Sequence, residues 1–355
     1  MIRNKMRKAS RALTAACLVV AAAALSACSS MINDDLRPCT ARYLVPITFT
    51  HNILDADAFP SQVTGVTLYV FDANGNLALR KTDSGAALSK PGYMMEVELP
   101  TGTYSMLAWC TGDAADSNPT AFAIGGGERP TAMSQLSASL PLQGTAPELF
   151  SDRDIVPLFY GTASGAVCRP GDDGDVILPT VDLMKDTNVL QIVLQNADTQ
   201  AEMDPQEFRV EVSGANSQIN YLNEVVGSTA FTYLPWSVQS LATENDAAQN
   251  TASRAAAVNS GMMTETTMGR LMIDREPRLK VVRTTDDVTI IDLNLTKYLC
   301  MVKGHYQAHW SDQEYLDRMD QHTIVFFIDA NRTWYTAMGI NINGWRIVPP
   351  QDQDL

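Results

Sequence analysis

Residues 66–76 read VTLYVFDANGN, and this stretch decides the fold class. Every second residue from Val66 to Val70 is aliphatic, which is the period-2 pattern of a β-strand with one buried face. The pair Asn74-Gly75 then predicts a tight turn, because both residue types tolerate positive φ.

Short alternating runs separated by turn residues continue on both sides of this stretch. Alternation with frequent turns favours antiparallel sheets over a parallel sheet with crossover helices. The pattern predicts strands at 43–50, 95–99, 104–109, 155–160, 176–178, 189–194, 208–212, 219–222, 271–273, 279–282, 288–295, 323–329 and 334–342.

Two segments lack this alternation. Residues 239–268 are rich in Ser, Ala, Thr and Asn, and we expect a long exposed loop there. Residues 311–319 fit a short helix, because Ser311 can cap its start and Glu314 completes a capping box.

Length and composition bound the architecture. The chain has 355 residues, of which 45% are hydrophobic and 19% charged. This is enough apolar material for folded cores and more chain than one average domain needs. The break at Pro179-Thr180 therefore predicts an N-terminal sandwich at 43–185 and a C-terminal sandwich at 186–355.

The first 27 residues have the pattern of a bacterial export signal. A basic start precedes an apolar run at 12–24 that is too short to cross a bilayer comfortably. The sequence Leu-Ser-Ala-Cys at 25–28 follows, and small residues before a cysteine at this place form a lipoprotein processing box. We predict that 1–27 is removed, that Cys28 carries fatty chains such as palmitate, and that 28–42 is a lipidated linker. The alternative is an ordinary secretory signal with a chance cysteine.

The charge balance excludes several partners. The net charge is −14, and it becomes −19 without the leader, which holds 5 basic residues and no acidic one. So acidic a chain is unsuited to a phosphate backbone, which excludes nucleic acid as the expected partner. It also disfavours electrostatic docking on an anionic membrane surface.

Four cysteines remain after Cys17 leaves and Cys28 is lipidated. An even number in an oxidising compartment suits disulfides, in any of three pairings, and buried free thiols are the alternative. No Cys-x-x-Cys spacing supports a zinc knuckle or a redox site. The disulfide candidates are Cys39, Cys110, Cys168 and Cys300.

The sequence lacks the motifs of common catalytic sites. It contains no His-Glu-x-x-His, no phosphate-binding glycine loop and no Gly-x-Ser-x-Gly. His305 and His309 are four residues apart and would share a helix face as metal ligands, but a third ligand is not evident and exposed loop histidines are the favoured interpretation. We therefore expect no enzyme activity, no cofactor and no metal site.

Aromatic residues offer one further hypothesis. A sugar-stacking platform would need several exposed rings together, whereas aromatics in strands usually belong to the core. The candidates are Trp236, Trp310, Trp334 and Tyr335.

Several short motifs follow one another in a recognisable order. They are the box at Cys28, DLRPC at 35–39, LYVFDANG at 68–75, YSMLAW at 104–109, VPLFYG at 156–161, QEYLDR at 313–318 and ININGW at 340–345. In this order they resemble the fimbrial anchoring-subunit family of Bacteroidales, which includes minor-fimbrium anchor lipoproteins. The resemblance covers nearly all of the chain after the leader.

The resemblance implies an all-β fold of two tandem transthyretin-like antiparallel β-sandwich domains, with the short helix and the long loop in the second. It also implies a structural subunit of surface fimbriae, acting as an anchor or as an accessory or tip subunit. Such a subunit would be lipid-anchored in the outer membrane and joined to other fimbrial subunits by β-strand addition. A host or bacterial surface ligand is a further expected partner.

In stalk subunits of such pili, removal of a first strand opens a groove that a neighbour's strand fills. Arg37 and Arg42 stand just before the predicted strand 43–50, where an arginine-specific protease would cut. An anchor has to keep both uncut, since cutting would release it from its lipid; ordinary linker charge is the alternative interpretation. The last strand is the expected partner edge, with Trp334, Met338, Ile340, Ile342 and Trp345.

A second function remains open on the sequence alone. A surface glycan-binding lipoprotein of a sugar-uptake system would also be acidic, lipidated and rich in strands.

Overall fold

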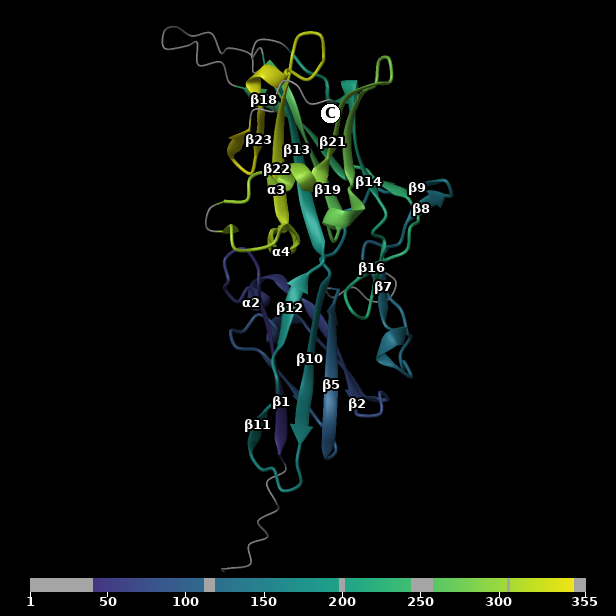
Figure 1. Cartoon of the computed structure of the whole chain (residues 1–355), viewed down its shortest axis with the longest axis vertical. Helices are drawn as coiled ribbons and strands as arrows, with labels where there is room; N and C mark the ends of the chain where they lie inside the picture. Colours follow the sequence, from purple (N-terminus) through teal and green to yellow (C-terminus); the bar gives the residue numbers. More distant parts are fainter. Residues whose placement is uncertain (1–40, 112–118, 198–201, 244–257, 305–306, 348–355) are drawn as a thin grey trace, which may run out of the picture. The chain divides into compact units, whose positions relative to one another are not determined.

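The structure is a computed structural model that describes residues 41–111, 119–197, 202–243, 258–304 and 307–347. It confirms the all-β fold, with sheets in sandwich-like arrangements (Figure 1). The strands are β1 (Arg42–His51), β2 (Gly65–Asp72), β3 (Leu77–Ser84), β4 (Met94–Val97), β5 (Gly102–Cys110), β6 (Ala123–Ile124), β7 (Ser137–Ser139), β8 (Gln143–Thr145), β9 (Glu148–Ser151), β10 (Phe159–Cys168), β11 (Asp175–Ile177), β12 (Val181–Lys185), β13 (Thr187–Asn196), β14 (Phe208–Gly214), β15 (Gln218–Asn220), β16 (Val225–Val226), β17 (Phe231–Tyr233), β18 (Ser237–Thr243), β19 (Val258–Gly269), β20 (Arg278–Arg283), β21 (Val288–Asn294), β22 (Gln321–Ile328), β23 (Ile340–Ile342) and β24 (Trp345–Ile347).

Helices are few and short in the described residues. They are α2 (Phe59–Gln62), α3 (Leu295–Cys300) and α4 (Asp312–Arg318). The predicted helix at 311–319 is confirmed as α4, and the Ser311 hydroxyl accepts the Glu314 N–H at 3.0 Å. Helix α3 was missed, although Asn294 caps it by accepting the Lys297 N–H at 2.9 Å. None of these helices is long and apolar enough to cross a membrane.

The chain divides into two compact units, residues 1–42 with 170–176 and residues 43–169 with 177–355. The described part of the first unit is small. In it, the Arg42 N–H donates to the Gly174 carbonyl at 2.8 Å, and the Arg42 guanidinium lies 3.3 Å from the Asp175 carboxylate.

The second unit contains the sheets. In the first of them the strand order is β1-β12-β10-β5-β2-β3, and Figure 1 shows β10, β5 and β2 as long neighbours. Strand β2 is buried on both faces, because Leu68 and Val70 pack on one side and Tyr69 and Phe71 on the other. The sequence alternation predicted that β2 has one buried face, and the structure shows that both of its faces are buried.

Two six-stranded sheets form the core of the second half of the chain. One has the order β18-β19-β13-β22-β23-β24, and the other has the order β21-β20-β14-β17-β9-β8. Aliphatic and aromatic residues of both sheets belong to one buried cluster, among them Ile192, Phe326, Val210, Leu279 and Leu293. This burial of two apolar faces against each other is what holds a sandwich together.

The sheets do not divide at residue 185. Strands β8 and β9 pair with β17, and a small sheet has the order β16-β15-β7-β6. Residues 123–151 thus supply strands to sheets whose other strands come after residue 205. The two domains at 43–185 and 186–355 stay a prediction.

Several local expectations were wrong. Residues 239–268 are not one long loop, because their described parts form β18 and β19, which pair with each other. Residues 271–273 form no strand. Three strand pairs are parallel rather than antiparallel, namely β1 with β12, β13 with β22 and β17 with β9.

Residues 334–342 are not one strand either. Trp334 makes an isolated bridge to Ile328, a 3-10 turn follows at Thr336–Met338, and only Ile340–Ile342 is β23. Gly339 causes the break, because its φ of +75° suits glycine, and a Cβ there would lie 2.4 Å from the Ile347 carbonyl oxygen.

Candidate functional site

The first strand is an integral part of its sheet. Its first half, Tyr43–Pro46, pairs antiparallel with β4, and its second half pairs parallel with β12 from Ile47 onward. Val45, Ile47 and Phe49 point into the core and are buried, and the Phe49 ring packs edge-on against Phe159 at 5.1 Å. Removing β1 would expose these side chains and leave backbone groups unpaired on both neighbours.

The chain just before β1 carries the predicted tether. Arg42 lies at the start of β1 with its N–H bonded to Gly174. Cys28, Arg37 and Cys39 lie outside the described residues, so the lipidation site, the first predicted cleavage site and one cysteine stay predictions.

The last strand, β24, is an edge of its sheet. It pairs with β23 through a two-residue turn at Asn343-Gly344, where both residues have positive φ. Among the described strands, β23 is its one partner. A free edge of this kind presents N–H and C=O groups that a strand from another chain can pair with.

The core-facing side of this sheet carries exposed side chains at both of its edge strands. Direct cross-strand partners form one row, from Val238 through Thr264, Ile192, Ile324 and Ile342 to Trp345. The four inner members are buried, whereas Val238 is 53% exposed and Trp345 is 66% exposed. An apolar row that ends in exposed side chains is a surface that an added strand could continue.

The structure separates the five residues predicted for the partner edge. Ile340 and Ile342 lie in β23 and are buried in the core. Trp334 packs edge-on against Phe326 at 5.7 Å and is partly buried, as is Met338. Of the five, only Trp345 lies on the edge strand with its side chain exposed.

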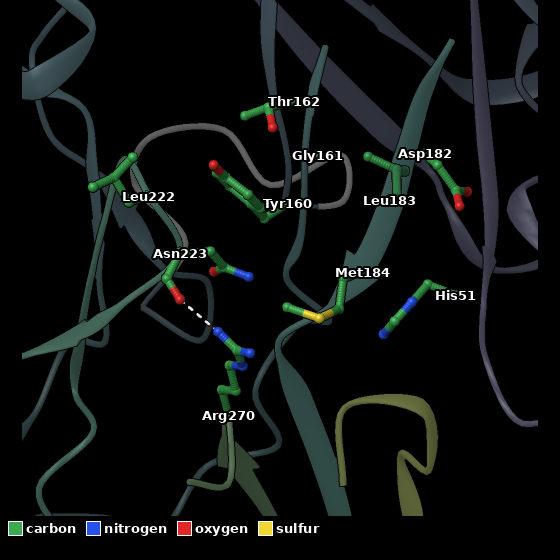
Figure 2. A pocket seen from close by; sticks show the side chains of 10 residues that line it. All are labelled: His51, Tyr160, Gly161, Thr162, Asp182, Leu183, Met184, Leu222, Asn223 and Arg270. Carbon is green, nitrogen blue, oxygen red and sulfur yellow. Dashed lines mark hydrogen bonds between the residues drawn. The ribbon is translucent and has the colours of Figure 1, made fainter. Parts of the chain in front are cut away.

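Polar side chains line an open cavity of about 330 Å³ (Figure 2). In that view Asn223 and Arg270 lie on one side and His51 on the other, with Met184 between them. The remaining lining residues are Tyr160, Gly161, Thr162, Asp182, Leu183 and Leu222.

The polar groups of this cavity bond to one another. The Arg270 guanidinium forms two hydrogen bonds with the Asp317 carboxylate, both at 2.8 Å, and also donates to the Asn223 carbonyl. Tyr160 donates its hydroxyl proton to the Tyr221 carbonyl at 2.8 Å. Asp182 accepts from Thr48 and Thr50. Groups occupied in this way join β1 to β12, and β10 to the later segment that contains Tyr221.

Asp186 contacts two residues of this cavity, Asn223 and Arg270, and is fully buried. Its Oδ1 accepts the Asn223 amide proton at 3.1 Å and lies 4.0 Å from Arg270 Nε. Its Oδ2 and the Asn223 Oδ1 are buried without hydrogen-bond partners among the described residues. Burial raises the pKa of the Asp186 carboxyl to about 7, against the opposing effects of Arg270 and Asn223.

No arrangement here suits a nucleophile or a metal ion. The described residues contain no group of three His, Cys, Asp or Glu side chains placed to bind a metal. Burial and the nearby Arg318 guanidinium lower the pKa of His51. The His309 ring is tilted against Trp310, with the ring centroids 5.2 Å apart, and His305 lies outside the described residues. We find no pair of side chains in the cavity with the geometry of a catalytic base and nucleophile.

The three cysteines in the described residues do not pair among themselves. Cys110 and Cys168 lie at opposite ends of the β5–β10 ladder, where they face Phe159 and Gly102, so their Cα atoms are too far apart for a disulfide. Cys300 lies in α3, and burial raises the pKa of its thiol to about 11. The prediction of disulfides among these three cysteines is therefore wrong, and their side chains are thiols.

The aromatic residues proposed as a sugar platform do not share one exposed face. Trp310 is buried and covered by the Arg318 guanidinium, whose carbon lies 4.7 Å from the ring centroid. Trp236 and Tyr335 are exposed, but Trp236 lies just before β18 and Tyr335 just before the 3-10 turn at Thr336–Met338.

Comparison with known proteins identifies the family. Residues 36–349 match the family model described as "Fimbrillin-A associated anchor proteins Mfa1 and Mfa2". The chain belongs to this family. A search of curated proteins found no match.

Solved structures agree with membership of the fimbrial anchor family. A candidate adhesin from Bacteroides thetaiotaomicron is 26% identical with a TM-score of 0.72, over 89% of this chain and 100% of that one. A candidate polysaccharide-binding protein from the same organism is 26% identical with a TM-score of 0.69, over 88% and 100%. The fimbrial anchor protein Mfa2 from Porphyromonas gingivalis is 16% identical with a TM-score of 0.59, over 87% and 99%, and supports the fold alone.

Proposed function

We propose that this chain is a lipid-anchored subunit of surface fimbriae, held in the outer membrane through Cys28 and without catalytic activity. Membership of the fimbrial anchor family supports the fimbrial role. The observation that carries the anchoring role is β1, which starts 14 residues after Cys28, pairs with β4 through its first half and with β12 through its second half, and buries its inward side chains. A tether joined directly to such a strand transmits force to the whole sandwich.

The same observation supports an uncut N-terminus. A protease needs the cleaved segment extended in its own cleft, but Arg42 already donates its N–H within the protein. Loss of residues before β1 would also separate the body from its lipid. In this proposal Arg37 and Arg42 remain intact, and β1 is never exchanged for a neighbour's strand.

Coupling to the next subunit takes place at the edge of β24 in this proposal. An incoming strand would bond to the free edge of β24, and its apolar side chains would cover Trp345. Burial of apolar surface contributes roughly 25 cal/mol per Å², and the backbone hydrogen bonds set the register. A subunit joined in this way needs no cofactor.

The lipid tether is tested by a Cys28→Ala variant expressed in the native bacterium. We expect the variant to leave the membrane fraction, because the acyl chains supply the membrane affinity. Cys39→Ala is the matched control and should stay with the membrane. A Cys28→Ala protein that remains membrane-bound would refute the tether.

The subunit role is tested by deleting the gene and imaging the cell surface. We expect fimbriae to be lost or altered in length, and the wild-type gene to restore them. Trp345→Arg should reach the membrane yet fail to restore fimbriae, whereas Tyr335→Arg, at an exposed aromatic outside the strands, should restore them. Unchanged fimbriae in the deletion strain would contradict the role.

A glycan-binding lipoprotein is the second candidate. Its support is the 26% identical neighbour that is described as polysaccharide-binding. Titration calorimetry with soluble oligosaccharides separates the two candidates. Saturable binding that Trp236→Ala removes would favour the second candidate.

A further inference from the structure

Strand β18 is the opposite edge of the sheet that ends in β24. It pairs with β19 along its whole length, from Ser237 opposite Glu265 to Thr243 opposite Val258. No other strand in the described parts of the chain pairs with it. The turn Pro205–Glu207 lies close to it, but no hydrogen bond joins the described residues of that turn to β18. The outer edge of β18 therefore offers backbone N–H and C=O groups.

This edge lacks the charged residues and the proline that usually block strand addition, and its one irregularity is a register shift between Leu241 and Ala242 in the ladder with β19. Its sequence, SVQSLAT, contains no charged residue and no proline. The other edge strands of similar length do carry charge, with Arg80, Lys81 and Asp83 on β3 and Asp292 on β21. Natural sheets protect long edges with charges or proline, so an unprotected seven-residue edge points to a partner.

Side chains at this edge also lack a cover. Val238 lies on the core face opposite Thr264, yet it is 53% exposed. Trp236, directly before the strand, is half-exposed and is held in place by its indole N–H, which donates to Thr267 Oγ1 at 3.1 Å. These two residues form an apolar margin that a neighbouring strand would bury.

Charge favours a different protein over a second copy of this chain as the partner of β18. The chain without its leader carries −19, so two copies placed edge to edge would repel each other. Near the edge, Glu265 lies opposite Ser237, on the strand adjacent to β18. An incoming strand with acidic residues would meet the same sign of charge, whereas a neutral or basic strand would not.

We propose that β18 accepts an extended strand of a different subunit, with apolar residues at alternate positions and no acidic residues. This inference rests on the proposed role as a fimbrial subunit, but it does not depend on the β24 edge. It gives the chain two docking edges on one sheet, so the protein could join two neighbours at once.

The test is photo-crosslinking in intact cells of the native bacterium. A photoreactive residue replaces Gln239, which is exposed on β18 and points away from the core, because its partner Met263 lies next to buried Thr264 in β19. The matched control carries the same residue in place of Lys81 on the charged β3 edge. A third arm places it at Arg346 on β24, which reports on the first edge.

We expect the β18 probe to join a strand segment of another fimbrial subunit, with at least a tenfold higher yield than the β3 control. Val238→Lys should reduce that yield tenfold or more without changing the thermal unfolding midpoint, and Val238→Thr should retain it. A product that joins two copies of this chain, or equal yields at β18 and β3, would overturn the proposal. Crosslinking at β24 without crosslinking at β18 would overturn this inference alone, and failure of both arms would count against the fimbrial role as well.

Discussion

The first and last described strands differ in their pairing with neighbouring strands and in the burial of their side chains. Strand β1 pairs with β4 through its first half and with β12 through its second half, and its inward side chains are buried, whereas β24 has one described partner and leaves Trp345 exposed. The difference separates strands that hold the body together from strands that can meet other molecules. Both lie near an end of the chain, so position in the sequence does not decide the role.

The largest expected effect comes from emptying the core beneath β1. Phe49→Ala removes a buried ring that packs on Phe159, and we expect a loss of about 3–5 kcal/mol in the free energy of unfolding. Urea unfolding followed by tryptophan fluorescence measures it. A loss below about 1 kcal/mol would mean that β1 is a replaceable strand after all.

The next effect concerns a buried charge close to β1's sheet. Because the pKa of Asp186 is raised to about 7 in the folded chain, folding favours its protonated form, and this group weakens stability as pH rises from about 4 to 7. Asp186→Asn should stabilise the protein at pH 8 by on the order of 4 kcal/mol and make little difference at pH 4.

Thermal unfolding of the wild type and Asp186→Asn across this pH range tests the effect. The difference between the two proteins isolates this one group from all others that titrate. A constant difference between pH 4 and pH 8 would show that Asp186 keeps an ordinary pKa.

A smaller effect is expected at the start of β1. Asp175→Ala removes the carboxylate 3.3 Å from the Arg42 guanidinium, and an exposed pair of this kind contributes about 0–1 kcal/mol. Trypsin should therefore cut after Arg42 up to about fivefold faster in the variant, as seen by mass spectrometry of short digests. Rapid cutting of the wild-type chain at Arg42 would contradict an occupied strand start.

The smallest effect is expected at β24, the strand compared with β1 above. Trp345→Ser should change the free energy of unfolding by no more than about 0.5 kcal/mol, because the side chain is mostly in water. The same unfolding experiment serves as the measurement. A loss comparable with that of Phe49→Ala would make β24 a core strand rather than an interface.

Local signals in the sequence predicted what depends on local chemistry. The Asn74-Gly75 turn joins β2 and β3, and Ser311 caps α4 as its hydroxyl and position suggested. Strand β19 was missed because its core positions are partly threonine, and Thr264 and Thr266 are buried without looking apolar. A period-2 row of Met262, Thr264, Thr266 and Met268 was the available signal, since threonine is β-branched and favours strands.

The sequence does not predict the buried polar contacts of Asp186. Asp186 follows Lys185 in sequence, and such a pair usually lies in solvent. Its partners, Asn223 and Arg270, come 37 and more residues later, and only the fold brings them to it. Gly339 likewise ends the expected last strand for a reason that depends on the Ile347 carbonyl, which approaches from the returning chain.

The pairing of β1 has a mechanical consequence. A force directed along β1 acts across its hydrogen bonds, because the bonds to β4 and β12 lie across the strand axis. These bonds are strained together rather than peeled one after another, so rupture requires many of them to fail at once. A protein strained in this shearing geometry resists flow and drag at the cell surface better than one whose terminal strand unzips from an edge.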